Sequence, residues 1–252
     1  MKPISGKSSA WVNKIDIYQD AEDLARGAAH FLANQMHQAL AARGQVKLML
    51  SGGSTPREVY ARLASPEIAN EVDWSRVHVF WSDERCVPPD HADSNFRMAQ
   101  ESLLQKVPIP EWQIHRVLGE LPPQEAAAKY ELALSAMTDA PVIDLLLLGM
   151  GDDGHIASLF PDSPTLAEDK RWVVAVPHDE PPPPFGWRVT VTFPLIFAAR
   201  QVVLIISGQK KAARLHQALF EQPGESPLPV QKLRDYEGQL IWLVDQAAAS
   251  LV

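Results

Sequence analysis

The stretch VKLMLSGGSTP, residues 46–56, decides the fold. Its first five residues form a mostly apolar run that predicts a short buried strand, and the SGGS that follows predicts a tight turn. Thr55 and Pro56 are typical of the cap and the first residue of a helix. A strand that leads through a glycine turn into a helix is the unit from which parallel α/β sheets are built.

The same alternation continues along most of the chain. Helices are predicted from Asp20 to Arg43, from Ser94 onward, from Pro123 to Met137 and over residues 209–221. Strands are predicted over residues 77–81, 114–117, 145–148, 172–176, 188–193, 202–207 and 240–244. This order predicts an α/β fold with a mainly parallel sheet and helices on both faces, and a ligand site beyond the carboxyl ends of the strands.

Composition and length predict one globular domain in a reducing compartment. With 252 residues and 46% apolar side chains, the chain can build a sizeable core. Four prolines at residues 181–184 predict a stiff connector or flap rather than a boundary, so we expect one domain over residues 1–252. The N-terminus lacks the apolar segment of a secretory signal, and no run approaches the roughly 20 apolar residues that span a bilayer. Together with a single cysteine, Cys86, these features predict a cytoplasmic protein.

The net charge of −8 argues against general nucleic-acid binding, which requires a basic face. An anionic small molecule would need a few cations gathered locally against this overall charge. Three polar clusters that directly follow predicted strands, at residues 51–55, 82–85 and 149–155, are the candidate places. The carboxyl ends of parallel strands meet at one rim of a sheet, so we expect the three clusters to converge.

The first cluster suits an anion. Its glycines let backbone N–H groups approach an oxyanion, its hydroxyls add donors, and the helix N-terminus adds a positive partial charge. It lacks the spacing and the lysine of a Walker loop, and the alternative interpretation is a plain strand-to-helix turn. Its members are Ser51, Gly52, Gly53, Ser54 and Thr55.

The second cluster places Asp83 and Arg85 at a strand end. Arginine can bind a phosphate or carboxylate through two parallel hydrogen bonds, and Asp83 could orient that arginine or accept a substrate hydroxyl. A solvated run of charges is the alternative. Two further cations, Arg188 and Lys211, also stand near strand ends, where they are either ligands or simple surface charge.

The third cluster, GMGDDGHIASLFP at residues 149–161, is the most specific. Gly151 and Gly154 permit a sharp turn whose N–H groups could face an oxyanion, and Asp153 can contact the ring of His155 or a ligand hydroxyl. A neutral imidazole can take a proton from water near pH 7. The alternatives are a metal site formed with Asp152, and a structural turn. No G-x-S-x-G elbow is present, which favours activated water over a covalent intermediate.

Five segments together resemble the 6-phosphogluconolactonases: SGGSTP at 51–56, WSDERCVPPDHADSNF at 81–96, LLLLGMGDDGHIASLFP at 145–161, RVTVTFP at 188–194 and SGQKKA at 207–212. The resemblance extends over roughly residues 15–245. It implies a Rossmann-like fold, shared with sugar-phosphate deaminases and ribose-phosphate isomerases. It also implies hydrolysis of 6-phosphoglucono-1,5-lactone to 6-phosphogluconate without metal or organic cofactor.

The resemblance implies a role for several residues. His155 is expected to be the general base that activates water, and the turn at 51–55 is expected to hold the phosphate together with Arg85. Asp153, Arg188 and Lys211 are expected at or near the pocket. One departure is that residues 180–184 read EPPPP, where family members often carry a lysine, and this bears on which cations bind the phosphate.

Two rival functions remain open at the level of sequence. Glucosamine-6-phosphate deaminases share the GxDGH turn but typically continue with an asparagine-glutamate-proline sequence, whereas residues 158–161 here read SLFP. A regulator that binds a sugar phosphate without turnover is the other alternative. We expect a small-molecule sugar-phosphate lactone as ligand, and no nucleic acid or membrane. The sequence predicts no particular number of subunits.

Overall fold

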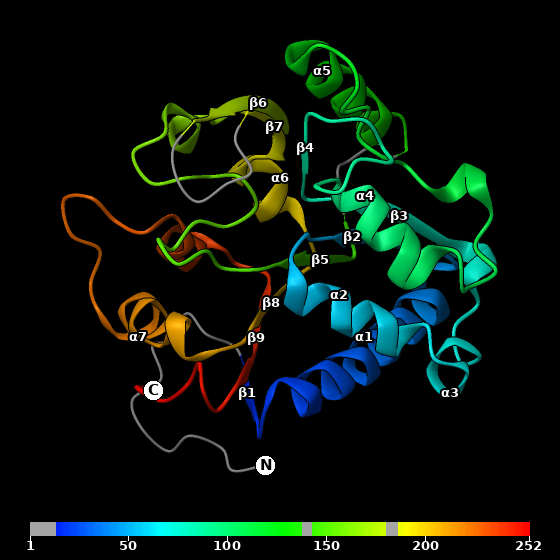
Figure 1. Ribbon diagram of the computed structural model, residues 1–252, viewed down its shortest axis with the longest axis horizontal. Coiled ribbons are helices and arrows are strands. Elements are labelled where there is room, and N and C mark those ends of the chain that lie inside the picture. The colour runs from blue at the N-terminus through cyan, green and yellow to red at the C-terminus, as the bar shows by residue number, and fades with distance from the viewer. Residues whose placement is uncertain (1–13, 138–142, 180–185) are drawn as a thin grey trace.

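The computed structural model describes residues 14–137, 143–179 and 186–252 (Figure 1). At its centre is a six-stranded sheet in the order β1-β9-β8-β5-β2-β3, in which every neighbouring pair is parallel. The predicted α/β fold with a mainly parallel sheet is thereby confirmed. The strands are β1 (Lys14–Tyr18), β2 (Val46–Leu50), β3 (Val77–Trp81), β5 (Leu145–Leu148), β8 (Gln201–Ile206) and β9 (Gln239–Asp245).

Helices cover this sheet from both sides, as Figure 1 shows for α1 and α2 on one side and α7 on the other. The seven α-helices of the described residues are α1 (Ala21–Arg43), α2 (Ser54–Leu63), α3 (Pro66–Ala69), α4 (Asn95–Ala99), α5 (Pro123–Ala136), α6 (Phe193–Ala198) and α7 (Ala212–Phe220). Short 3₁₀ helices span Trp74–Arg76, Glu111–Gln113, Pro164–Ala167, Gln209–Lys211 and Pro229–Asp235, and a π-helical turn spans Gln100–Leu104. No helix in the part of the chain that the structure describes is long and apolar enough to cross a membrane.

Local sequence explains where the first elements begin and end. The side chain of Asp20 accepts a hydrogen bond from the N–H of Asp23 and caps α1, which ends at Gly44 as predicted. All residues of β2, β3, β5 and β8 are buried, as expected for parallel strands covered on both faces. The predicted helix after the SGGS turn begins two residues earlier than expected, at Ser54 instead of Pro56.

A second, three-stranded sheet was not expected. It pairs β4 (Asp83–Arg85), β7 (Gly186–Val191) and β6 (Val173–His178) in antiparallel order. The strands predicted over residues 172–176 and 188–193 are therefore present as β6 and β7, but they pair antiparallel and lie outside the parallel sheet. Only seven residues, 179–185, connect β6 to β7, and a parallel crossover needs about a dozen or more.

Three further predictions differ from the structure. Residues 114–117 form no strand but only a single bridge between Ile114 and Val79. Phe193, predicted as a strand end, begins α6. β1 was not predicted, since its five residues are at most half-buried and give a weak pattern. The proline run at 181–184 lies outside the described residues.

Candidate active site

A cavity of about 390 Å³ opens where β2, β5 and β8 end, beside β4. The three polar clusters converge there, as the parallel sheet predicts. Ten predicted site residues line it, namely Ser51, Gly52, Gly53, Ser54, Thr55, Asp83, Arg85, Gly151, His155 and Lys211. Asp153, Gly154 and Arg188 do not line it, although Asp153 contacts the ring of His155 and Arg188 is opposite Arg85 in the β4–β7 pair. Three polar residues that the sequence analysis did not assign to substrate binding also line it: Asn95, Asp152 and Ser207.

The turn after β2 is held in place by Tyr60 of α2. The buried Tyr60 hydroxyl accepts a hydrogen bond from the N–H of Ser51 at 2.9 Å and donates to the carbonyl of the same residue at 2.9 Å. Gly53, the residue before α2, makes no side-chain cap, so the first N–H groups of this helix have no intrahelical or capping partner. Together with the hydroxyls of Ser54 and Thr55, they suit an anion in the cavity.

Asp83 joins the second cluster to the other two. One of its carboxylate oxygens accepts from the hydroxyl of Ser158 at 2.7 Å, and its backbone carbonyl accepts from Nδ2 of Asn95 at 2.9 Å. Asn95 in turn lies against Gly52, where a Cβ atom would come within 2.1 Å of its Oδ1. This close approach requires glycine at position 52. The side chain of Asp83 is thereby fixed at the cavity wall.

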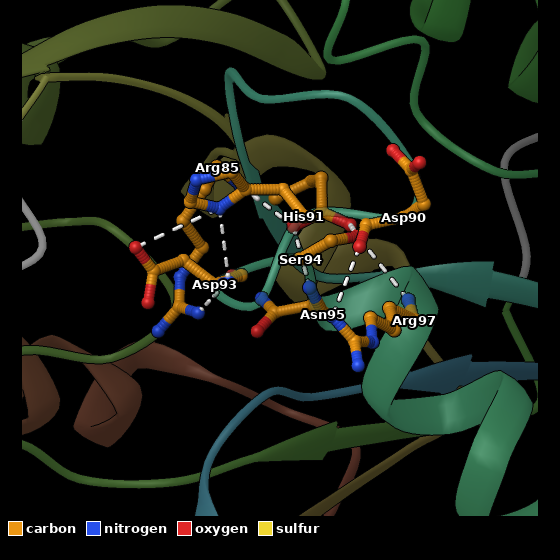
Figure 2. Close-up of polar contacts among 8 residues, drawn as sticks. Arg85, Asp90, His91, Asp93, Ser94, Asn95 and Arg97 are labelled. Carbon is orange, nitrogen blue, oxygen red and sulfur yellow. Dashed lines mark hydrogen bonds and ion pairs between the residues drawn. The ribbon is translucent and has the colours of Figure 1, made fainter.

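Arg85 ends β4 and lines the cavity, and Figure 2 shows the loop that follows it. Its Nη1 donates to the backbone carbonyl of Asp93 at 2.5 Å. In the β4–β7 pair, Arg85 is opposite Arg188, which is only 4% exposed. Burial, and then the positive charge of Arg85, lower the pKa of Arg188. Arg188 therefore lies next to Arg85 instead of lining the cavity itself.

His155 and Asp153 form a close pair. The distance between Nδ1 of His155 and Oδ1 of Asp153 is 2.6 Å, and the same oxygen accepts the N–H of His155 at 3.1 Å. Burial acts to raise the pKa of Asp153, but the hydrogen bonds and charge of His155 outweigh it and lower the pKa to about 2. An ionised carboxylate can only accept, so Nδ1 carries a hydrogen and, in the neutral ring, Nε2 is the basic nitrogen.

The surroundings of the His155 ring fix its orientation. A Cβ atom on Gly151 would lie 2.2 Å from Nδ1, so only glycine leaves room for the ring there. On another side, the Phe160 ring packs with its centroid 4.8 Å from that of His155, and it is itself stacked on His178 at 4.2 Å. The imidazole is held by the hydrogen bond to Asp153 and by these two contacts.

The turn around Gly151 and Gly154 does not supply oxyanion donors in the way the sequence suggested. The N–H of Gly151 donates to the carbonyl of His155 at 2.9 Å, and the N–H of Gly154 donates to the carbonyl of Gly151 at 3.1 Å. Both groups are used inside the turn, so the expectation that they face an oxyanion is wrong for this geometry. Their role is to shape the turn that carries His155.

Lys211 enters the cavity from the 3₁₀ helix that follows β8. Its Nζ lies 2.5 Å from Oδ1 of Asp152, and the backbone carbonyl of Asp152 accepts from Nε of Arg214 at 3.2 Å. Since Asp152 pairs with Lys211 and Asp153 with His155, the two carboxylates serve separate partners. Within the described parts of the chain, no group of three or more His, Cys, Asp or Glu side chains is arranged to hold a metal ion.

Comparison with known proteins adds an independent finding. The family model described as glucosamine-6-phosphate isomerases/6-phosphogluconolactonase matches residues 19–242. The chain is 40% identical over 248 residues to "Probable 6-phosphogluconolactonase 3, chloroplastic" of Oryza sativa subsp. indica, covering 94% of this chain and 75% of that protein. It is 34% identical to "Probable 6-phosphogluconolactonase 1" of Arabidopsis thaliana, covering 95% of each.

Solved structures agree with the sequence match. The 6-phosphogluconolactonase of Trypanosoma brucei superposes with a TM-score of 0.86 at 28% identity, covering 94% of this chain and 97% of that one. The Thermotoga maritima 6-phosphogluconolactonase gives a TM-score of 0.80 at 32% identity, covering 92% and 99%. A monomeric glucosamine-6-phosphate deaminase shares the fold at 21% identity. The chain therefore belongs to the family of glucosamine-6-phosphate isomerases and 6-phosphogluconolactonases.

Proposed function

We propose that this protein hydrolyses 6-phospho-D-glucono-1,5-lactone to 6-phospho-D-gluconate, a step of the oxidative pentose phosphate pathway. The observation that carries the proposal is the His155–Asp153 pair: the ring of His155, whose Nδ1 is held by Asp153, lines a cavity that also contains the turn at 51–55 and Arg85. A base and a phosphate site in one cavity suit a sugar-phosphate lactone. The relatives named as 6-phosphogluconolactonases support the same substrate.

The proposed reaction uses water as the nucleophile. Nε2 of His155 takes a proton from water as the water oxygen bonds to the lactone carbonyl carbon, and the carbonyl electrons move to its oxygen. When the tetrahedral intermediate collapses, the bond to the ring oxygen breaks, and the imidazolium returns the proton to that oxygen. Asp153 keeps Nδ1 protonated and stabilises the imidazolium between these two steps.

The rest of the cavity binds and orients the substrate. We assign the phosphate to the turn at 51–55 and to Arg85, with Lys211 as a further cation at the wall. The N–H groups of Gly151 and Gly154 are engaged in their turn, so neither is assigned to the oxyanion. Asp83 is assigned to a substrate hydroxyl, since its carboxylate is fixed at the wall.

We propose no covalent intermediate and no metal in this reaction. Ser158, the serine within the third cluster, is 1% exposed and donates its hydrogen to Asp83 at 2.7 Å, so it is not presented for attack on a substrate. Asp152 and Asp153, the two carboxylates of the turn, are paired with Lys211 and His155. Activity in the presence of a chelator tests whether a metal takes part.

The decisive experiment is hydrolysis of freshly generated lactone, followed by acid release, against the spontaneous rate and with EDTA present. We expect acceleration that survives EDTA and falls at least roughly a hundredfold in kcat in His155→Ala, the lower end of general-base contributions. No acceleration by the wild-type protein would refute the lactonase proposal, and ammonia release from glucosamine 6-phosphate would then be measured. Loss of activity in EDTA that zinc restores would refute the metal-free mechanism alone.

We propose that the protein is located in the cytoplasm, because the chain has a single cysteine, as is typical of proteins in a reducing compartment. The rice relatives carry the word chloroplastic in their names, so the two compartments are the alternatives to compare. Imaging the chain with a fluorescent tag at its C-terminus in its own cells tests this. A plastid or other organelle signal would refute the cytoplasmic assignment.

A further inference from the structure

Glu84 is a buried carboxylate next to the cavity that the proposed reaction does not use. It occupies the middle of β4, between Asp83 and Arg85, and it is only 2% exposed. Successive side chains of a strand point to opposite faces. Asp83 and Arg85 line the cavity, and Glu84 accordingly points away from it.

Both oxygens of this carboxylate are saturated with hydrogen bonds. Oε1 accepts the backbone N–H groups of Arg85 and Asn95, each at 2.7 Å. Oε2 accepts the backbone N–H of Phe96 at 2.7 Å and the hydroxyl of Ser94 at 3.1 Å. Burial raises the pKa of Glu84, and the hydrogen bonds from the three backbone donors act against that shift.

These four donors belong to the two ends of the loop that carries the phosphate arginine. Arg85 begins the loop, while Ser94, Asn95 and Phe96 form the start of α4. Figure 2 shows that the loop closes on itself, with Arg85 bonded to the carbonyl of Asp93. One carboxylate therefore holds the backbone of Arg85 and of Asn95, and the side chains of both residues line the cavity.

A neutral side chain of the same shape cannot replace this carboxylate. Four donors converge on two oxygens, and glutamine would offer one oxygen and turn an NH₂ group toward two donors. A buried donor left without an acceptor is unfavourable, so the loop would shift until water or another group satisfied it. The first side chain to move with the loop would be Arg85.

We propose that Glu84 is a positioning residue for substrate binding, which sets the loop at 85–94 so that Arg85 meets the phosphate end of the substrate. The inference rests on the proposed function, because it takes Arg85 as a phosphate ligand. Glu84 itself touches neither the substrate nor the reacting atoms. Its removal affects binding of the phosphate more than the proton transfer at His155.

A double-mutant cycle separates this role from a general loss of stability. We expect Glu84→Gln to raise KM for the lactone about tenfold with kcat within about threefold, the pattern of lost binding. We expect Arg85→Ala to raise KM by at least as much, and Glu84→Gln to add less than about twofold in the Arg85→Ala background, because coupled residues are not additive. Dissociation constants for 6-phosphogluconate, from calorimetry, should follow the same pattern.

Glu131→Gln is the matched control. Glu131 of α5 also accepts backbone N–H groups from a distant segment, those of Trp172 at 2.5 Å and Val173 at 3.2 Å, but it does not line the cavity. We expect this variant to lower Tm while leaving KM unchanged. If Glu84→Gln does not fold, Glu84→Asp, which keeps the charge but shortens the side chain, is taken through the same cycle.

The outcomes separate the inference from the proposed function. The inference is overturned if the Glu84 variant raises KM by the same factor in the wild-type and Arg85→Ala backgrounds. It is also overturned if the Glu84 variant lowers Tm but leaves KM unchanged, which is the result expected for Glu131→Gln. An effect of Arg85→Ala without any effect of the Glu84 variant also overturns it and leaves the proposed function intact. Unchanged KM in Arg85→Ala refutes the phosphate role of Arg85, and the inference with it.

Discussion

Asp153→Asn tests the chemistry at the centre of the site, because it removes one charge and almost no volume. The carboxylate lies 2.6 Å from Nδ1 of His155, so the two charge centres are about 4 Å apart when the ring is protonated. At an effective dielectric constant of about 20, such a pair contributes about 4 kcal/mol. The side chain of Asp153 is 42% exposed, and solvent screening reduces this to roughly 2 kcal/mol.

A loss of roughly 2 kcal/mol in the state with a protonated ring corresponds to about a 30-fold fall in kcat. KM should stay unchanged, since Asp153 does not line the cavity. Initial rates of lactone hydrolysis at constant pH, corrected for the spontaneous rate, measure both constants. Asp152→Asn is the control with the opposite signature: it releases Lys211 and should act on KM. A kcat for Asp153→Asn within about threefold of wild type, or a loss seen only in KM, would refute the reasoning.

Contacts of Tyr60, Gly151 and His115 give three further predictions. Tyr60→Phe leaves the N–H and carbonyl of Ser51 without their partner. We therefore expect the free energy of unfolding in urea to fall by about 2 kcal/mol and KM to rise. A free energy of unfolding equal to that of wild type would contradict the role of this contact. Gly151→Ala places a Cβ 2.2 Å from Nδ1 of His155 and should lower kcat roughly a hundredfold with little change in Tm; normal turnover would show that the ring can move freely. Burial lowers the pKa of His115 from 6.5 to about 4, because the folded protein disfavours the charged ring. The contribution of the neutral ring to stability, roughly 2 kcal/mol, is therefore fully present above pH 6.5 and is lost as the pH falls toward 4. His115→Gln should therefore lose less stability than wild type between pH 7 and 4.5 in urea unfolding, and an equal loss would contradict this sign.

The central sheet could be predicted from the sequence because its strands are buried on both faces. Continuous apolar runs as short as residues 145–148 are typical of such strands, and the start and end of α1 are marked by Asp20 and Gly44. The second sheet could not be predicted in the same way. A sequence pattern that predicts a strand does not indicate which other strand it pairs with. In addition, β4 is only three residues long, and all three residues are charged. Its pairing with β7 depends on a contact between residues about a hundred positions apart.

The sequence predicted those cavity-lining residues that directly follow a strand. Asn95 could not be found in this way, because it begins a helix twelve residues after Asp83, the residue that it contacts. Asp152 was identified only as a possible metal ligand, since nothing in the sequence indicates that Lys211 lies beside it. Conversely, Gly154 was predicted correctly as part of the turn, but its N–H faces the inside of that turn. Direction of a backbone group is a property of the folded turn, not of its composition.

The residues that hold the strand ends explain how loops can carry a well-defined site. The hydroxyl of Tyr60 both donates to and accepts from Ser51, and the hydroxyl of Tyr130 does the same for Trp81, with distances between 2.7 and 2.9 Å. Both tyrosines are buried, and burial raises the pKa of each, so neither hydroxyl ionises near neutral pH. Each therefore remains a donor and an acceptor at once, whereas an ionised phenolate could only accept. The ends of β2 and β3 are fixed by side chains of α2 and α5, so the position of the turn at 51–55 depends on a buried core residue and not on the loop alone.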